Sequence, residues 1–206
     1  MIETGKRTIK HAMALASSLR YEEEHSRQVS KVALMFFDEL RELHSLGKRE
    51  RLLLEVGSLL HDIGWVEGRT SHHKKARDII LESKIPGLSR EEHIIVALIA
   101  RYHRKSLPRN NHGYYSELSK KSKNIVRILA SLVRLADGLD RTHLSLVQDI
   151  KCGIQVKKIV LHIRKNGYSE IDEFTGKKKA DLFEDVFGRK LEIKWNHSQS
   201  DSHFSA

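Results

Sequence analysis

The stretch Val56–Trp65, VGSLLHDIGW, places a histidine and an aspartate side by side at the end of an apolar run. Burial of either side chain without a partner costs free energy, because an unpaired carboxylate in a low-dielectric interior tends to take up a proton rather than stay charged. His61 and Asp62 therefore need partners. A local hydrogen bond or ion pair is the structural explanation, and a bound cation is the functional one.

Length and composition set the outer limits on the class of this protein. Its 206 residues suit one domain with a modest appendage, and 39% hydrophobic with 31% charged residues is an ordinary globular composition. The single Cys152 excludes a disulfide framework, and no apolar run approaches the roughly 20 residues that a membrane span needs. The N-terminal segment MIETGKRTIK lacks the apolar core of a signal peptide, so we expect a cytoplasmic protein with no membrane partner.

The net charge of +10 favours anionic partners. It does not distinguish nucleic acid, nucleotides, polyphosphate and plain solubility from one another. Neither a DNA-binding helix pattern nor an aromatic-rich basic stripe is present in the sequence, so nucleic acid is not specifically indicated. The choice between a monomer and a homodimer stays open.

Helical periodicity dominates the sequence as far as about Leu146. One buried helix face is predicted from the i, i+3, i+4, i+7 spacing of Val29, Val32, Ala33, Phe36, Phe37 and Leu40. Further helices are predicted over 49–62, 72–83, 90–104 and 124–140, with breaks at Gly64, Pro86, Gly87 and Pro108.

The periodicity changes to strict alternation near residue 150. Three half-buried strands are predicted from the apolar positions Ile150, Cys152, Ile154 and Val156, then Ile159, Leu161 and Ile163, and later Leu191, Ile193 and Trp195. The segment KKKADLFEDVFG is predicted to be a short amphipathic helix that ends at Gly188. We therefore expect a mainly α protein, with a helical domain over 1–148, a small α/β subdomain over 149–195 whose strands form one sheet, and a disordered tail over 196–206.

Polar residues interrupt the apolar faces of five predicted helical segments. These residues are His25, His61, His72, His103 and Asp137, each spaced by three, four, seven, eight or eleven residues from apolar positions of its own segment. Any one of them alone is more often a hydrogen-bonded core residue than a metal ligand. Together with Asp62 they would form a large polar network, which a divalent cation satisfies at once. Mixed imidazole and carboxylate ligands suit manganese, iron, cobalt, nickel or zinc rather than calcium.

The pattern His25, then His61-Asp62, then Asp137 resembles the H…HD…D signature of the HD superfamily of metal-dependent phosphohydrolases. The ordered segments LLHDIGW, HHKKARDII, IIVALIARYHRK, LVRLADGLDRTH and KKKADLFEDVFGRKLEI are similar to the C-terminal half of the exopolyphosphatase and guanosine pentaphosphate phosphohydrolase (Ppx/GppA) family. This likeness runs from about residue 6 to residue 195. It implies an HD-type helical bundle followed by the small α/β domain of that family.

The resemblance also implies a set of metal ligands. A first ion would be held by His25, His61, Asp62 and Asp137, and a second ion by the additional ligands His72 and His103, with Asp62 and water as bridges. Two ions about 3.5–4 Å apart lower the pKa of a bridging water and bind the attacking and leaving oxygens of a phosphoester. We therefore expect one or two divalent transition-metal ions, with His61 and Asp62 at the catalytic centre.

A phosphoester substrate also needs cationic partners, for which the planar fork of arginine is well suited. The predicted phosphate-binding residues, which lie next to the proposed ligands in the sequence, are Lys74, Arg101, Arg104, Lys105 and Arg134. Each is explained equally well as a solvated surface charge.

Other histidines and Asp140 are predicted to have supporting roles or no role in the metal site. His73 is an alternative to His72 as a ligand, and Asp140 is a candidate to orient a ligand imidazole through a hydrogen bond. The histidines that lack this convergence, and are predicted at the surface or at helix ends, are His44, His93, His112, His143 and His162.

Two functional classes follow from the resemblance. Family members carry their phosphatase site in an N-terminal actin-like half, which has no counterpart in this sequence, so we expect catalysis at the HD centre. The enzyme hypothesis is hydrolysis of a phosphomonoester or nucleotide-type phosphoester, with a phosphorylated small molecule or nucleotide as the partner. The alternative is a non-catalytic regulatory or binding module for nucleotide or polyphosphate. The complete ligand set favours the enzyme.

Overall fold

The computed structural model describes residues 2–19, 21–68 and 70–197, which form a helical part followed by an α/β part. The helical part comprises α1 (Ile2–Ser18), α2 (Glu23–Glu39), α3 (Arg41–His44), α4 (Lys48–Leu59), the short 3-10 helix η1 (Ile63–Glu67), α5 (His72–Glu82), α6 (Arg90–Tyr102) and α7 (Lys120–Leu139). The α/β part comprises β1 (Val147–Ile154), β2 (Lys158–Lys165), α8 (Glu170–Lys178), α9 (Asp181–Phe187) and β3 (Lys190–His197). The predicted mainly α fold with a small α/β part is confirmed.

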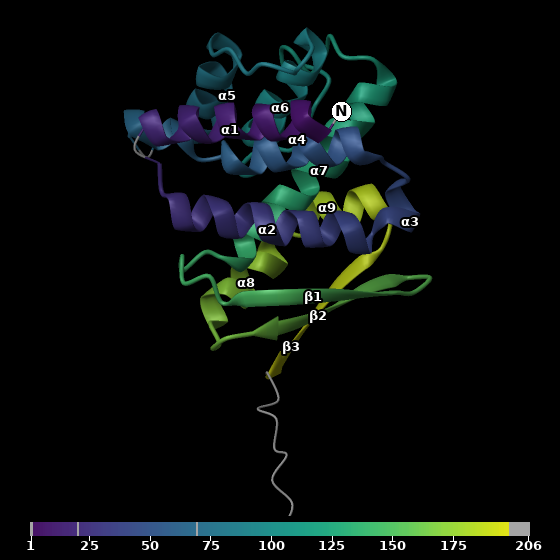
Figure 1. The fold of residues 1–206 in the computed structure, drawn as a ribbon. Coiled ribbons are helices and arrows are strands. Elements are labelled where there is room, and N and C mark those ends of the chain that lie inside the picture. Colours follow the sequence, from purple (N-terminus) through teal and green to yellow (C-terminus); the bar gives the residue numbers. More distant parts are fainter. Residues whose placement is uncertain (1, 20, 69, 198–206) are drawn as a thin grey trace, which may run out of the picture.

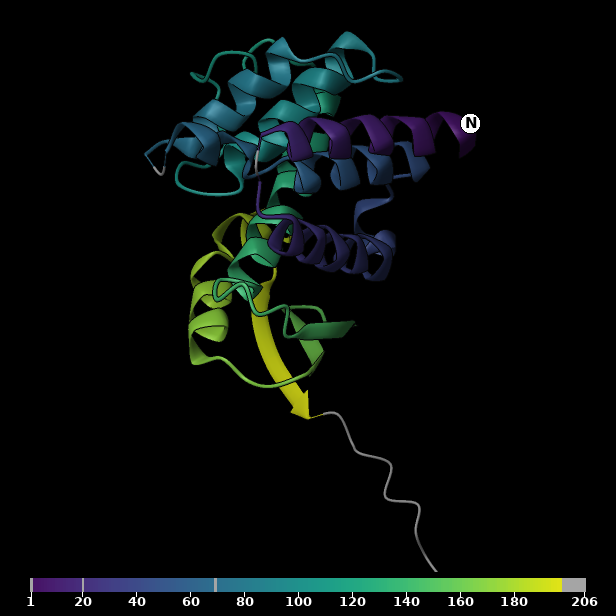
Figure 2. The ribbon, with the colours of Figure 1, turned by 60° about the vertical axis from the view of Figure 1, so that its left-hand side comes forward.

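Helix α7 joins the two parts into one core. It is buried almost without interruption from Ile125 to Leu139, as expected of a helix that is covered on all sides. It packs against α2, α4 and α6 of the helical part and against α8 and α9 of the α/β part. Figures 1 and 2 show α7 running from the group that contains α4 and α6 toward the sheet. The rings of Phe36 on α2 and Phe183 on α9 lie 6.4 Å apart, so the apolar core continues across both parts.

The three strands of the α/β part form one sheet in the order β1-β2-β3. β1 and β2 are an antiparallel hairpin in which Ile150 lies opposite Ile163, and β2 and β3 are parallel, with Ile163 opposite Trp195. A parallel pair needs a crossover connection, which α8 and α9 supply. α9 packs against β3, so the predicted sheet and its covering helix are confirmed.

The helix that carries the opening stretch ends earlier than predicted. α4 stops at Leu59, and His61 and Asp62 lie in the turn between α4 and η1. Gly64 lets this turn approach the start of α5, since a Cβ atom at Gly64 would lie 2.1 Å from the carbonyl oxygen of His72. The turn therefore holds Asp62 close to the first residue of α5.

Helix α8 was not predicted from the sequence. Its apolar side chains Ile171 and Phe174 are 59% and 67% exposed, so it has no continuous buried stripe to reveal it. The predicted helix KKKADLFEDVFG corresponds to the end of α8 and to α9, which ends before Gly188 in the left-handed conformation.

The end of the chain differs slightly from the prediction. β3 continues to His197, two residues into the segment predicted as a tail. Residues 198–206 of that predicted tail lie outside the described residues. Of the helices that the structure describes, none combines the length and apolar character that crossing a membrane requires.

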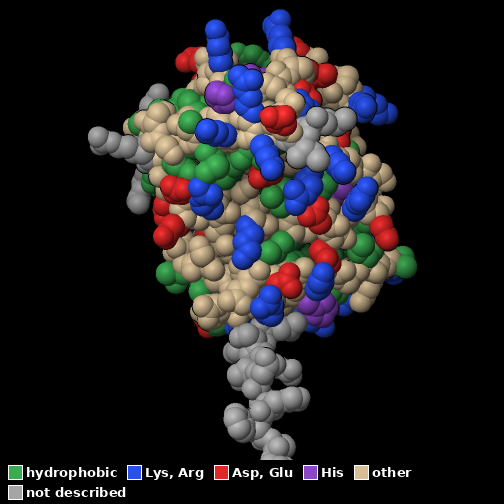
Figure 3. Space-filling view, viewed as in Figure 1, with side chains coloured by type: hydrophobic (Ala, Val, Ile, Leu, Met, Phe, Trp, Pro, Cys, Tyr) green, Lys and Arg blue, Asp and Glu red, His purple; other side chains and the backbone are tan. Residues whose placement is uncertain are grey.

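The basic charge is dispersed on the face of the molecule shown in Figure 3. Lys and Arg side chains alternate there with Asp and Glu side chains over both parts of the fold. On this face the net charge of +10 therefore does not form one continuous basic patch.

Candidate metal centre

Four of the predicted ligands converge from two helices and the turn that follows α4. His25 Nε2 lies 3.9 Å from Asp62 Oδ2 and 3.5 Å from Asp137 Oδ1. His61 Nε2 lies 3.6 Å from Asp62 Oδ2 and 4.0 Å from Asp137 Oδ1. His25 comes from the first turn of α2 and Asp137 from the last turn of α7. The apolar stripes of these helices bury the ligand atoms together at one place.

Two further histidines approach the other oxygen of Asp62. His72 Nε2 lies 3.2 Å and His103 Nε2 lies 3.4 Å from Asp62 Oδ1. Among the residues that the structure describes, two groups have metal-ligand spacing, His25 with His61 and Asp62, and Asp62 with His72 and His103. Within each group the ligand atoms lie within 4.8 Å of one another. Asp62 is common to both groups and presents one oxygen to each. A carboxylate in this position can bridge two cations.

Helix ends orient the imidazoles of this centre. His61 and His103 lie two residues and one residue after the ends of α4 and α6, where the last backbone carbonyls have no partner inside the helix. Each histidine donates its Nδ1 proton to the carbonyl three residues earlier, His61 to Ser58 and His103 to Ala100, at 2.7 Å in both cases. With the proton fixed on Nδ1, the lone pair of Nε2 faces the centre.

His25 has a side-chain partner in the same role. Its Nδ1 donates to Asp140 Oδ2 at 2.8 Å, and Asp140 Oδ1 accepts the backbone N–H of Ser145 at 2.8 Å. This is the position expected of a residue that orients a ligand imidazole.

Unpartnered buried atoms test whether these residues fit a metal ion. His25 Nε2, His61 Nε2 and Asp62 Oδ1 are buried and have no hydrogen-bond partner among the described residues. Leaving such a group unsatisfied costs about 1–3 kcal/mol each. A cation bound at these atoms would remove that cost, so the donor set fits a transition metal.

The histidines of the centre differ in protonation. Burial lowers the pKa of His61 and holds that of His103 well below its ordinary value, so both imidazoles are neutral. Burial also opposes the charge of His25, but the neighbouring carboxylate of Asp137 and the hydrogen bond to Asp140 raise its pKa to about 10. A cation at His25 Nε2 would have to replace a proton there.

Both carboxylates of the centre are ionised despite their burial. Burial alone would raise the pKa of Asp62, but the neighbouring imidazoles of His61 and His72 hold it well below its usual range. Burial opposes the ionisation of Asp137 in the same way, and the charge of Lys179 together with the neighbouring imidazole of His25 holds its pKa well below the ordinary value. The centre therefore offers two anionic ligands.

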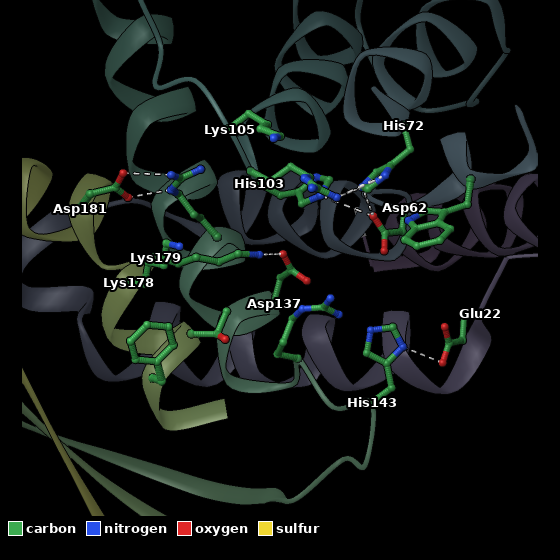
Figure 4. Close-up of a pocket in the computed structure, with 16 residues that line it drawn as sticks. Glu22, Asp62, His72, His103, Lys105, Asp137, His143, Lys178, Lys179 and Asp181 are labelled. Carbon is green, nitrogen blue, oxygen red and sulfur yellow. Dashed lines mark hydrogen bonds and ion pairs between the residues drawn. The ribbon is translucent and has the colours of Figure 1, made fainter. Parts of the chain in front are cut away.

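The centre borders a pocket of about 840 Å³, which Asp62, His72, His103 and Asp137 help to line (Figure 4). Among the described residues, the basic side chains that line this pocket are Arg104, Lys105, Arg134, Arg141, Lys178 and Lys179. They come from the helical part and from α8, so the two parts of the fold form the pocket together. A pocket with carboxylates and imidazoles at one side and cations around it suits a phosphorylated ligand.

Comparison with known proteins decides the family. Residues 6–173 match the family model of Ppx/GppA phosphatase, domain III. The chain belongs to the Ppx/GppA phosphatase family. Over 114 residues this Ppx/GppA chain is 28% identical to the guanosine-5'-triphosphate,3'-diphosphate pyrophosphatase of Pseudoalteromonas translucida (strain TAC 125), a match that covers 53% of this chain and 22% of the relative. The chain thus matches about a fifth of the length of that curated relative, and the predicted resemblance to the Ppx/GppA family is confirmed.

The Ppx/GppA match contains every predicted metal ligand but not the whole pocket. It ends at residue 173, within α8, and so leaves out Lys178 and Lys179. The pocket residues at the end of α8 therefore lie in a segment that the family match does not cover.

Three of the five predicted phosphate-binding residues of this Ppx/GppA chain line the pocket. Arg104 Nη1 lies 3.1 Å from His72 Nε2. Arg134 donates from Nε and Nη2 to the carboxylate of Asp181 at 2.7 and 2.9 Å, which balances its charge. Lys105 lines the pocket at a backbone φ of 61°.

The other two lie away from the pocket lining. Lys74 is exposed on the first turn of α5, and Arg101 is buried on α6, with its guanidinium carbon 5.5 Å from the ring centre of Tyr102. Both stand two residues from a predicted ligand on a helix, so they project from a different face. Proximity to a predicted ligand in the sequence therefore did not bring these two residues to the pocket lining.

His73 also lies outside the pocket lining. Its ring is buried 6.4 Å from the ring of His103, and burial together with the neighbouring charges of Arg101 and Arg104 lowers its pKa to about 3. His72, and not His73, faces Asp62.

His143 is a pocket residue that was predicted only to lie at the surface or at a helix end. Its ring stacks on His25 at 3.8 Å between ring centres, and its Nδ1 donates to Glu22 Oε1 at 2.8 Å. Its φ of 59° puts it in a turn after α7 that helical periodicity does not describe. The available signal was its position three residues after Asp140 in the segment LVRLADGLDRTH.

Proposed function

We propose that this chain is a metal-dependent phosphohydrolase that acts on a phosphomonoester or nucleotide-type phosphoester at an HD-type centre. The observation that carries the proposal is the sharing of Asp62 between two groups with ligand spacing, His25 with His61 and His72 with His103. A purely structural ion would gain nothing from a second group that faces a pocket.

The ligands divide between two cations. A first divalent ion would be held by His25, His61, Asp62 and Asp137, and a second by Asp62, His72 and His103. Imidazole and carboxylate ligands favour manganese, iron, cobalt, nickel or zinc. When bound, such ions act as Lewis acids that polarise a phosphoryl oxygen and activate water.

The side chains around the proposed ligands would bind the substrate and orient the ligand imidazoles. Arg104 and Lys105 lie at the pocket wall and would bind phosphoryl oxygens of the substrate. Trp65 stacks on His72 at 4.9 Å between ring centres and covers that ligand from one side. Asp140 keeps the His25 ring turned toward the centre through the hydrogen bond to Nδ1.

The substrate class follows from the size and charge of the pocket. A volume of about 840 Å³ lies within the usual range for small-molecule sites, and the basic lining favours an anion. The curated relative is named for a guanosine nucleotide that carries several phosphates, so such nucleotides belong in the substrate panel. Because the match covers 22% of that relative, its activity is a hypothesis to be tested for this chain.

Metal analysis and a phosphate-release assay test the proposal. Protein purified without chelators should contain a transition metal and should release phosphate from an aryl phosphate or from a member of a nucleotide panel. His61→Ala and Asp62→Ala should lose most of the metal and the activity, whereas His162→Ala, which removes an exposed histidine on β2, should lose neither.

Two outcomes would contradict the proposal. Unchanged metal content in both ligand variants would exclude the site. A metal-loaded, folded wild-type protein that is inactive on every phosphoester tried would favour the regulatory or binding module instead.

A further inference from the structure

The α/β part reaches the candidate metal centre through a close contact between α7 and α8. A Cβ atom added at Gly138 would lie 3.0 Å from both Gly176 Cα and Thr175 O. The two helices approach this closely because both glycines lack a side chain. Gly138 directly follows Asp137, and Gly176 precedes Lys179 by three residues. The contact therefore brings the end of α8 beside the carboxylate of Asp137.

Lys179 is the basic residue that this contact places beside the candidate metal centre. Its backbone N–H donates to the carbonyls of Thr175 and Gly176 at 2.9 and 3.2 Å, which fixes its Cα at the end of α8. Its Nζ donates a hydrogen bond to Asp137 Oδ2, while Asp137 Oδ1 faces His25 Nε2 at 3.5 Å. Figure 4 shows Lys179 extended across the pocket toward Asp137. The side chain is 18% exposed and lines the pocket.

The partner of Lys179 distinguishes it from other cations of the pocket. Arg134 is held by Asp181, which is not a proposed metal ligand. The partner of Lys179 is Asp137, whose carboxylate the proposed function assigns to a cation. Once Asp137 binds a cation, it attracts the ammonium group of Lys179 far less, because two positive charges then share one carboxylate. An anion in the pocket is the replacement partner that balances the charge of Lys179.

We propose that Lys179 is a substrate-binding residue that pairs with Asp137 before the substrate arrives and with a phosphoryl oxygen afterwards. A lysine suits this exchange, because its ammonium is a compact charge on a flexible stem with three donors. The inference rests on the proposed function, since it places the phosphoryl group at the same centre. It gives the α/β part a role in substrate binding as well as in packing.

Binding of inorganic phosphate and steady-state kinetics test this role. Lys179→Met keeps the aliphatic stem and removes the charge, Lys179→Arg keeps the charge, and Lys177→Met is the matched control on the same helix. Lys177 is exposed and pairs with Glu173, and it is not among the described residues that line the pocket. All proteins are loaded with Mn²⁺, and calorimetry measures phosphate binding alongside kcat, KM and metal content.

Loss of the charge should weaken phosphate binding and raise KM about tenfold, the size of one charge-assisted hydrogen bond. Lys179→Arg should recover most of the phosphate affinity, and Lys177→Met should match the wild type. Metal content and the unfolding temperature of the loaded proteins should stay the same. These readouts separate substrate binding from a structural role.

Two results would overturn the role of Lys179 and leave the proposed function intact. One is equal phosphate affinity and KM in wild type and Lys179→Met. Another is loss of metal from Lys179→Met, which would make the lysine a support for Asp137. The phosphate titration needs no turnover, so equal affinity overturns the inference even for a protein that binds phosphoesters without hydrolysing them. Absence of metal and of activity in the wild type would instead count against the proposed function.

Discussion

Replacing Asp140 by asparagine changes one oxygen of a buried carboxylate into an amide nitrogen of the same size. Asp140 is 1% exposed, and its Oδ2 accepts the Nδ1 proton of His25 at 2.8 Å while its Oδ1 accepts the N–H of Ser145. The asparagine oxygen can still serve one of these donors but not both. If it keeps Ser145, the amide nitrogen faces His25 Nδ1, and the imidazole proton is driven to Nε2, the atom that faces the metal centre.

The size of the effect follows from these contacts. Loss of the partner that orients a ligand histidine typically lowers metal affinity 10- to 100-fold, which is about 1.4–2.7 kcal/mol. We therefore expect Asp140→Asn to weaken Mn²⁺ or Zn²⁺ binding by this factor, as measured by competition with a chelating dye. The unfolding temperature of the metal-free protein checks that the fold is retained.

A surface aspartate supplies the matched control for this experiment. Asp149 on β1 has a 41% exposed side chain and lies 3.8 Å from Arg164, so Asp149→Asn should leave metal affinity unchanged. Equal metal affinity in Asp140→Asn and wild type would refute the reasoning that Asp140 fixes the tautomer of His25.

Three further changes have defined outcomes. Gly138→Ala should destabilise the protein by roughly 1–3 kcal/mol in chemical unfolding, because its Cβ would meet the backbone of α8 at 3.0 Å, while Gly153→Ala, with contacts no closer than 3.7 Å, should cost less. The hydrogen bonds from Arg49 lower the pKa of Glu92 from 4.5 to about 2, so Glu92→Gln should lower the free energy of unfolding by about 1 kcal/mol at pH 7. The difference between variant and wild type should disappear as the pH falls from 4.5 toward 2, and a difference that stays constant with pH would contradict this reasoning. His103→Ala should lower phosphate release about 100-fold while the protein still unfolds cooperatively, and normal turnover would exclude a second ion as part of the reaction.

The convergence of the proposed ligand residues could be predicted from the sequence because these residues lie on regular helices or within three residues of a helix end. The apolar residues of α2 determine which face of that helix is buried, and His25 shares that face with Val29. The same argument holds for Asp137 within α7. Periodicity thus predicted which polar side chains point inward, and the need to satisfy them predicted a common partner.

The pocket wall could not be predicted in the same way. His143 lies in a turn with a left-handed backbone, and Lys179 lies at the junction of two short helices, so neither has a periodic environment. The position of Lys179 depends on the contact between Gly138 and Gly176, two residues 38 positions apart in the sequence. Conversely, Arg101 was included because it is near His103 in sequence, and the helix turns it toward Tyr102 instead.

Anomalous diffraction from crystals grown with Mn²⁺ tests the central claim most directly, because it locates bound ions independently of any substrate. The account predicts two anomalous peaks on either side of Asp62, one between His25 and His61 and one between His72 and His103. The absence of any peak at Asp62 in crystals of the folded protein, with Mn²⁺ and again with Zn²⁺, would contradict it.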